Sequence, residues 1–350
     1  MESPPSQVKP TIFFLHHEDC QQLIGTWKQG LGTWNLATGQ LVRHQIIPEM
    51  FARARDCRSE NEGSVFFQTL MESDTVRAWD IRLSQEISQF PGHALPNDGY
   101  VISPDRRKVA GCSYPPKSVS VWETQTGAKQ YEFPWSGFFG QNLWLGFTPD
   151  GQKLFGGNGL SYKAPCVIKG WDLHTGDECF QTTPTEKRGF MISSGANEGA
   201  SHYEGVCALK ISRDGRLLVA ALYEGLIKIW STHSGELLWE YPLPLSYLGG
   251  TKHLDKGLVM GIAPNDTVLF CQCPGYQDSL WFMLELETGN VLQQGQSSEG
   301  RVFHFAFSDD SKTVVTASPF DRTAVMKIWD WQRSPSPQPL ILQAQPSPGY

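Results

Sequence analysis

The sequence predicts an all-β fold, a single seven-bladed β-propeller built from four-stranded antiparallel blades. Three observations support this prediction. A tryptophan-marked motif recurs seven times along the 350 residues, and a turn motif precedes most of its copies. Short, β-rich apolar runs lie between these signals at intervals of about 8–12 residues, which is typical of barrels, sandwiches and propellers.

The recurring motif consists of an apolar residue, Trp, a polar or acidic residue, two variable residues, Thr or Ser, and Gly. Its clear copies are TWNLATG (33–39), VWETQTG (121–127), GWDLHTG (170–176) and IWSTHSG (229–235), and its weaker copies are AWDIRLS (78–84), MLELETG (283–289) and IWDWQRS (328–334). The marker position is occupied, at intervals of 43–59 residues, by Trp34, Trp79, Trp122, Trp171, Trp230, Leu284 and Trp329. A repeat of this length suits one four-stranded blade.

The turn motif lies 16–21 residues before the marker in five copies, namely SPD (103–105), TPDG (148–151), SRDG (212–215), APND (263–266) and SDDS (308–311). Asp, Asn and Gly favour tight turns because they tolerate left-handed backbone angles and bond to their own main chain. An apolar run such as RLLVAALYEG (216–225) follows the turn, and another such as ELLWEYPL (236–243) follows the Gly. Each unit therefore reads as strand, turn, strand, loop, Trp-bearing strand, TG turn and strand.

With its WD pairs at Trp79–Asp80, Trp171–Asp172 and Trp329–Asp330, the chain resembles the WD-repeat β-propellers over about residues 11–344. Repeats of that family usually open with Gly-His, whose histidine joins a buried hydrogen-bond network. Only Gly92–His93 matches that opening well, so we expect most blades to be held by apolar packing instead. We expect a Pro-rich N-terminal segment (1–10), the propeller (11–344) with an insertion at 182–205 between blades four and five, and a C-terminal tail (345–350).

Closure of the ring is a separate question, because members of the family usually complete the last blade with an N-terminal strand. Proline cannot donate to a ladder, and the first ten residues here are Pro-rich. The segment PLILQA (339–344) is a better outer strand for blade seven. We therefore expect closure by packing of the first and last blades, helped by whatever pairing SQVK (6–9) can make.

Composition restricts the class of function. Hydrophobic residues make up 40% of the chain and charged residues 19%, as in a soluble globular protein. The net charge is −7 and no long basic run exists, so we expect neither a nucleic-acid partner nor an acidic membrane partner. No signal peptide or membrane-spanning run is evident, and we expect a cytoplasmic protein with free, mostly buried thiols. The cysteines are Cys20, Cys57, Cys112, Cys166, Cys179, Cys207, Cys271 and Cys273.

Metal and catalytic signals are weak. The stretch HHEDC (16–20) holds five residues that can bind metals, but it occupies the place of the SPDG turn, and His16 and His17 are adjacent on the strand side, so they point to opposite faces. Cys271 and Cys273 share a strand face and read as core. The glycine-rich GNGL (157–160) has no following helix, which disfavours a dinucleotide site. No metal site, catalytic residue or cofactor is predicted.

A second periodicity indicates a binding face. Six blades carry an aromatic residue 7–9 positions before the marker, where the second and third strands are joined, and the remaining blade has Met71. The six are Trp27, Tyr114, Tyr162, Tyr223, Tyr276 and Phe320. Exposed, they form a rim of rigid contact groups of the kind that dominates protein interfaces. The alternative is that each ring packs against the neighbouring blade and caps the core.

The predicted function is a non-catalytic interaction platform. The resemblance implies a rigid ring that binds a protein or peptide partner on the face bearing the aromatic residues. The insertion adds Lys187, Arg188, Phe190 and Tyr203 as candidate contacts, either disordered or ordered on binding. The alternative is an enzymatic or ligand-binding propeller with a site at the channel mouth, where His304 lies on a candidate inner strand. The sequence gives no oligomeric state.

Overall fold

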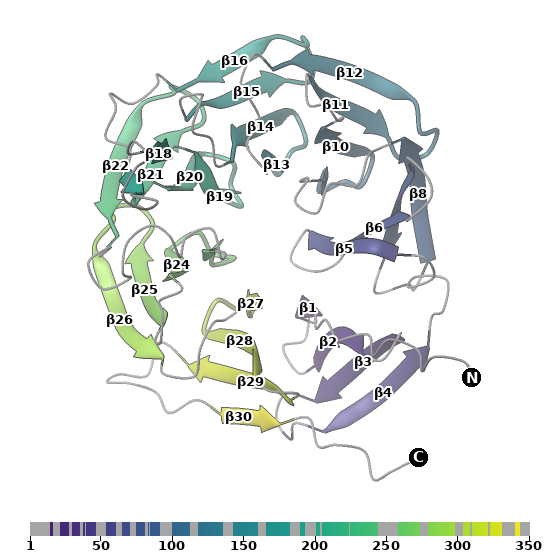
Figure 1. The fold of residues 1–350 in the computed structure, drawn as a ribbon, viewed down its shortest axis with the longest axis vertical. Helices are drawn as coiled ribbons and strands as arrows, with labels where there is room; N and C mark the ends of the chain where they lie inside the picture. Colours follow the sequence, from purple (N-terminus) through teal and green to yellow (C-terminus); the bar gives the residue numbers. More distant parts are fainter. Residues whose placement is uncertain are drawn as a thin grey trace.

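The ring in the computed structural model is built from consecutive four-stranded sheets that surround a central axis (Figure 1). The structure describes residues 15–16, 22–27, 30–35, 38, 40–46, 54–60, 65–70, 75–80, 83, 85–91, 100–112, 118–135, 143–159, 166–182, 190–192, 201–203, 205–223, 225–243, 258–273, 279–297, 304–308, 310–320, 323–330 and 340–343. Within these ranges the chain forms seven four-stranded antiparallel sheets and one two-stranded sheet, and no helix. The all-β propeller is confirmed, and the seven sheets equal the seven marked copies in number.

The sheets are numbered as blades 1 to 7 in chain order. Blades 1 to 3 comprise β1 (Leu15–His16), β2 (Gln22–Trp27), β3 (Gly30–Asn35) and β4 (Leu41–Ile46); β5 (Ala54–Glu60), β6 (Val65–Leu70), β7 (Thr75–Asp80) and β8 (Gln85–Pro91); and β9 (Val101–Ile102), β10 (Lys108–Cys112), β11 (Ser118–Glu123) and β12 (Lys129–Pro134). Blades 4 and 5 comprise β13 (Leu143–Phe147), β14 (Lys153–Asn158), β15 (Ile168–Asp172) and β16 (Glu178–Gln181); and β19 (Val206–Ile211), β20 (Leu217–Leu222), β21 (Leu226–Ser231) and β22 (Leu237–Pro242). Blades 6 and 7 comprise β23 (Val259–Ile262), β24 (Val268–Cys273), β25 (Ser279–Glu285) and β26 (Val291–Ser297); and β27 (His304–Phe307), β28 (Thr313–Phe320), β29 (Thr323–Asp330) and β30 (Leu340–Gln343).

The ring closes between blades 1 and 7, whose inner strands β1 and β27 lie side by side (Figure 1). Each blade consists of four described strands that are consecutive in sequence, so none combines strands from both ends of the chain. The outer strand of blade 7 is β30, within the segment that the sequence predicted for it. Residues 1–10, whose pairing was left open, lie outside the described part.

The core lies between blades rather than inside them. One apolar cluster joins blades 2 and 3, and others join blades 3 and 4, 4 and 5, 5 and 6, and 6 and 7. The marker residues are central to it: Trp122 stacks on Phe90 of blade 2 at 5.4 Å, and Trp171 stacks on Phe133 of blade 3 at 5.0 Å. Leu284, the marker without an indole ring, is fully buried. Trp122, Trp171, Trp230 and Leu284 each lie in a cluster that joins their blade to the preceding one.

The outer strand changes register opposite the marker position. In blades 1 to 6, a β-bulge places two residues of the fourth strand against the marker residue. The doubled pairs are Leu41 and Val42, Glu86 and Ile87, Lys129 and Gln130, Glu178 and Cys179, Leu237 and Leu238, and Val291 and Leu292. A bulge bends its strand and breaks the ladder locally, so it twists the exposed edge of each blade away from regular pairing.

Candidate interaction surfaces of the ring

The antiparallel blades give the ring two different faces. The turn face carries the turns after the first and third strands of each blade, and the loop face carries the junction of the second and third strands and the connections between blades. The predicted aromatic positions belong to the loop face. Trp27 ends β2, Phe320 ends β28, and Tyr223 directly follows β20, so the backbone places these three where the repeat predicts.

Tyr223 is the predicted contact whose side chain the structure describes, and it is buried. Its exposed fraction is 6%, and it packs in the cluster between blades 5 and 6. Its backbone N–H donates to the Gly205 carbonyl at 2.9 Å. For Tyr223 the structure therefore favours the packing alternative, because a buried ring offers no surface to a partner. Tyr114, Tyr162, Tyr276 and Arg188 lie outside the described residues.

The insertion forms a small hairpin of its own. Strands β17 (Phe190–Ile192) and β18 (Ser201–Tyr203) pair in an antiparallel sheet, with Phe190 opposite Tyr203. Whether the rest of the segment orders only on binding stays a prediction. The hairpin brings two predicted contacts, Phe190 and Tyr203, into one cross-strand pair.

The inner strands of blades 3 to 6 are almost entirely apolar. Their sequences are VI, LWLGF, VCALKI and VMGI, and the ionisable residues in them are Cys207 and Lys210. Blades 7, 1 and 2 differ, because β27 begins with His304, β1 ends with His16, and β5 carries two arginines, an aspartate and a glutamate. Sequence analysis overlooked the charged strand β5 because it lacks the turn motif on which the alignment relied. Among the described residues, no group of three or more His, Cys, Asp or Glu side chains is arranged to hold a metal ion.

The paired cysteines belong to the core, as the sequence indicated. Cys271 and Cys273 are fully buried in the cluster between blades 5 and 6, together with Cys207. The hydrogen bond with Cys273, which favours the protonated form, and the burial of the site raise the pKa of Cys271 well above the ordinary value of a thiol. Protonated thiols in an apolar cluster act as small packing groups and not as thiolate ligands.

Packing explains the first glycine of GNGL (157–160). A side chain on Gly157 would start 2.7 Å from the Val206 side chain of the next blade. The following Asn158 is buried, and its side-chain oxygen accepts the Val167 N–H at 2.7 Å. Gly157 therefore allows blades 4 and 5 to approach each other closely.

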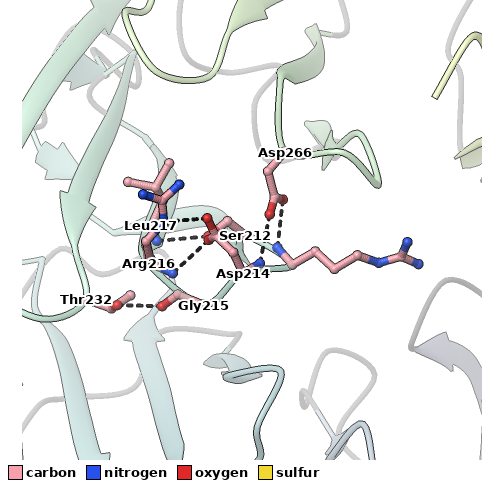
Figure 2. A network of polar contacts seen from close by, with 8 residues as sticks. Ser212, Asp214, Gly215, Arg216, Leu217, Thr232 and Asp266 are labelled. Atoms are coloured by element: carbon pink, nitrogen blue, oxygen red, sulfur yellow. Dashed lines mark hydrogen bonds and ion pairs between the residues drawn. The ribbon is translucent and has the colours of Figure 1, made fainter. Parts of the chain in front are cut away.

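The turn face repeats one polar arrangement. In blade 5 the buried Ser212 hydroxyl donates to Asp214 at 2.7 Å and accepts the Leu217 N–H at 2.9 Å (Figure 2). Burial by itself would raise the pKa of Asp214, but hydrogen bonds from Ser212 and Arg216 outweigh it, so the pKa lies below its ordinary value. The same hydroxyl-to-aspartate bond occurs in blades 3, 4 and 7, at Ser103–Asp105, Thr148–Asp150 and Ser308–Asp310.

The fourth turn position connects neighbouring blades. It has a left-handed backbone in five blades, occupied by Arg106, Gly151, Gly215, Asp266 and Ser311. The Asp266 carboxylate accepts the backbone N–H groups of Arg213 and Asp214 in blade 5, at 2.7 and 2.8 Å (Figure 2). The Ser311 hydroxyl accepts the Asn265 N–H of blade 6 at 3.0 Å, and Arg106 pairs with the buried Asp80 of blade 2.

A second set of contacts between blades lies nearer the outside. The Tyr131 hydroxyl donates to the Leu173 carbonyl of blade 4, and Trp239 Nε1 donates to the Leu286 carbonyl of blade 6 at 3.1 Å. The ring of Trp239 also covers Gly289, where an added Cβ would meet the indole at 2.7 Å. The Gly of the TG turn thus supplies both a left-handed backbone and the space for the neighbouring ring.

Comparison with known proteins agrees with this geometry. The sequence model of the family described as "WD domain, G-beta repeat" matches residues 198–231, which span β18 and the first three strands of blade 5. The protein therefore contains a WD repeat within an all-β propeller fold. The match begins at residue 198, so it overlaps the end of the predicted insertion (182–205).

Among solved structures, 1506 chains match this WD-repeat protein. One is the Kuenenia stuttgartiensis Hydrazine Synthase, with 14% sequence identity and a TM-score of 0.59 over 93% of this chain and 98% of that chain. At this identity the likeness concerns the fold alone. No curated protein matches the sequence. None of the described residues belongs to a helix with the length and hydropathy needed to cross a membrane.

Proposed function

We propose that this protein is a non-catalytic, cytoplasmic interaction platform that binds a protein or peptide partner on its loop face. The observation that carries the proposal is a WD repeat set in a ring whose neighbouring blades are fastened by paired contacts. Such a ring presents loops from many blades with little conformational entropy left to lose on binding. The acidic net charge supports a protein partner over nucleic acid or an acidic membrane.

The proposed contacts are the loop-face residues other than the buried Tyr223. They are Trp27, Tyr114, Tyr162, Tyr276, Phe320, Arg188 and Tyr203. Aromatic and arginine side chains bury much area per immobilised group, which suits them to the centre of an interface.

Affinity capture from native extract tests the proposal. Wild type is compared with a Tyr114→Ala/Tyr276→Ala variant and with Leu83→Ala, a control at an exposed leucine on the turn face. The double variant is expected to lose partners that wild type and control retain, with an unchanged thermal midpoint. An identical set of partners in all three would place the docking surface elsewhere.

The charged inner strand of blade 2 favours a second candidate, a ligand-binding or enzymatic site at the channel mouth. Strand β5 reads ARDCRSE and lies beside the axis (Figure 1). Under this alternative, inorganic phosphate or Zn²⁺ raises the thermal midpoint of wild type. The rise should vanish in Arg55→Ala/Arg58→Ala for phosphate or in Asp56→Asn for Zn²⁺. No shift with either probe would argue against the alternative.

A further inference from the structure

Exposed aliphatic side chains gather on the outer strands of two consecutive blades. Among the described residues, six large apolar side chains are more than 40% exposed, and four of them lie on β22 and β26. These four are Leu237, Leu238, Val291 and Leu292, with exposed fractions of 47%, 48%, 42% and 44%. The other two, Val42 and Leu83, are in blades 1 and 2.

The fold does not require apolar residues at these positions. All four occupy the doubled positions of the β-bulge opposite the marker. Blade 3 has Lys129 and Gln130 at the same two positions, and blade 4 has Glu178 and Cys179. The bulge therefore also forms with polar residues, and four exposed aliphatics in consecutive blades need another explanation.

Trp239 connects blade 5 to blade 6 beside these two pairs. It follows Leu238 directly, and its ring reaches across to Gly289, which is two residues before Val291. Trp239 is itself only partly buried. We call the surface formed by Leu237, Leu238, Trp239, Val291 and Leu292 the blade 5–6 rim.

The charge beside this rim is negative. Glu236 precedes Leu237, Glu240 follows Trp239, and Glu287 lies in the TG turn before Val291, all exposed. Lys228 offsets Glu240 at 3.7 Å. The guanidinium of Arg216 is held by Asp214 at 2.5 Å. A partner would thus meet an apolar strip flanked by carboxylates.

We propose that the blade 5–6 rim binds an amphipathic helix of a partner protein, with an apolar stripe over the aliphatic residues and Lys or Arg beside the glutamates. An added β-strand is disfavoured, because a bulge interrupts the ladder of both outer strands at the rim. A helix needs no backbone pairing and presents its apolar residues along one side. Acidic lipid is disfavoured by the same carboxylates. This surface is separate from the loop face.

A designed peptide probes the rim directly. The probe is a synthetic peptide of leucine and lysine patterned as an amphipathic helix, and the control peptide has the same composition in scrambled order. Fluorescence anisotropy compares wild type with Leu238→Gln/Leu292→Gln, which copies a residue found in blade 3, and with the matched variant Leu83→Gln. Leu83 is 65% exposed, so its replacement removes exposed leucine surface away from the rim.

The helical peptide is expected to bind wild type and Leu83→Gln alike and the rim variant about tenfold or more weakly. A Glu236→Gln/Glu287→Gln variant is expected to bind with a smaller dependence on salt. The proposal is overturned if wild type does not bind the helical peptide, if the scrambled peptide binds equally, or if Leu83→Gln weakens binding as much as the rim variant. Binding of neutral phosphatidylcholine vesicles that depends on Leu238 and Leu292 would replace the helix with a lipid surface.

Discussion

Replacing Asp266 tests whether side chain–backbone hydrogen bonds hold blades 5 and 6 together on the turn face. The carboxylate accepts two N–H groups, from Arg213 and Asp214, and its own backbone has a φ of 55°. Two effects therefore oppose each other at one residue. The bonds stabilise the junction, and the left-handed backbone destabilises it for any residue with a Cβ.

The two effects give different expectations for alanine and glycine. A hydrogen bond to a charged group contributes about 1.5–3 kcal/mol, but both bonds here are solvent-exposed, so we assign roughly 1 kcal/mol to each. Asp266→Ala loses both bonds and keeps the left-handed strain, so we expect a loss of about 2 kcal/mol. Asp266→Gly loses the same bonds but relieves about 1 kcal/mol of strain, so we expect a net loss of about 1 kcal/mol.

Equilibrium urea unfolding followed by tryptophan fluorescence measures these free energies of unfolding. Asp266→Asn is the third variant, because its side-chain oxygen can keep one bond and asparagine tolerates a left-handed backbone. We expect it between wild type and alanine. The reasoning fails if alanine is as stable as wild type, or if glycine is less stable than alanine, since either result would mean that the two bonds contribute little or that the strain is absent.

Three further predictions concern the other contacts. Trp239→Phe keeps an aromatic ring over Gly289 but removes the hydrogen bond to the Leu286 carbonyl, so urea unfolding should show that the free energy of unfolding falls by about 1 kcal/mol. Gly289→Ala should lower the free energy of unfolding further, because its Cβ would collide with the indole of Trp239. Since the pKa of Asp214 is lowered, its carboxylate stabilises the fold above the unfolded pKa of about 3.9 and stops doing so as pH falls through the lower folded pKa. The stability difference between wild type and Asp214→Asn should therefore shrink between pH 7 and acid; a constant difference would refute this origin. Iodoacetamide should label Cys179 before Cys166, Cys207, Cys271 or Cys273, because Cys179 is the exposed one of these five. Burial raises the pKa of Cys179, so its labelling rate should keep rising with pH to a value above the pKa of a free thiol. Mass spectrometry of the labelled peptides measures the order of labelling, and a buried cysteine modified before Cys179 would contradict the prediction.

The repeat was predictable because its signals are local. A marker residue, a TG turn and an SPDG turn each determine a few neighbouring backbone angles, and their period gives the blade. Even Leu284, which lacks the indole, was assigned correctly from its spacing, and it is fully buried. These local signals could not show whether the aromatic side chain of Tyr223 is exposed to a partner or buried against the next blade. That distinction depends on whether the next blade covers the side chain, and blade 6 does.

Contacts between blades were not predictable from single repeats, because donor and acceptor lie far apart in sequence. Asp266 is 53 residues from Arg213, and Trp239 is 47 residues from Leu286. Each of these residues looks ordinary in its own repeat, as a turn aspartate or an outer-strand aromatic. The function of each appears only when its counterpart in the adjacent blade is known.

The residue at the second turn position of one blade is related to the residue at the left-handed position of the next blade. The second position of the turn is Pro104 in blade 3 and Pro149 in blade 4, and the next blade has glycine at the left-handed position in both cases. A Cβ on Gly215 would lie 3.2 Å from the Pro149 ring. Blade 5 instead has Arg213 at the second turn position. Arg213 has a backbone N–H, and Asp266 of the next blade accepts it.

A proline at the second turn position explains why the residue type at the left-handed position of the next blade changes. It has no N–H, so an aspartate in the following blade would lack one of the two donors that Asp266 uses. Blade 6 has Pro264, and Ser311 of blade 7 bonds the next N–H along, that of Asn265. Arg213→Pro should therefore remove one of the two bonds of Asp266 and make Asp266→Ala less destabilising than in wild type. If the effects of Arg213→Pro and Asp266→Ala on the free energy of unfolding were additive in a double-mutant cycle, the residue at the left-handed position would be independent of the preceding blade.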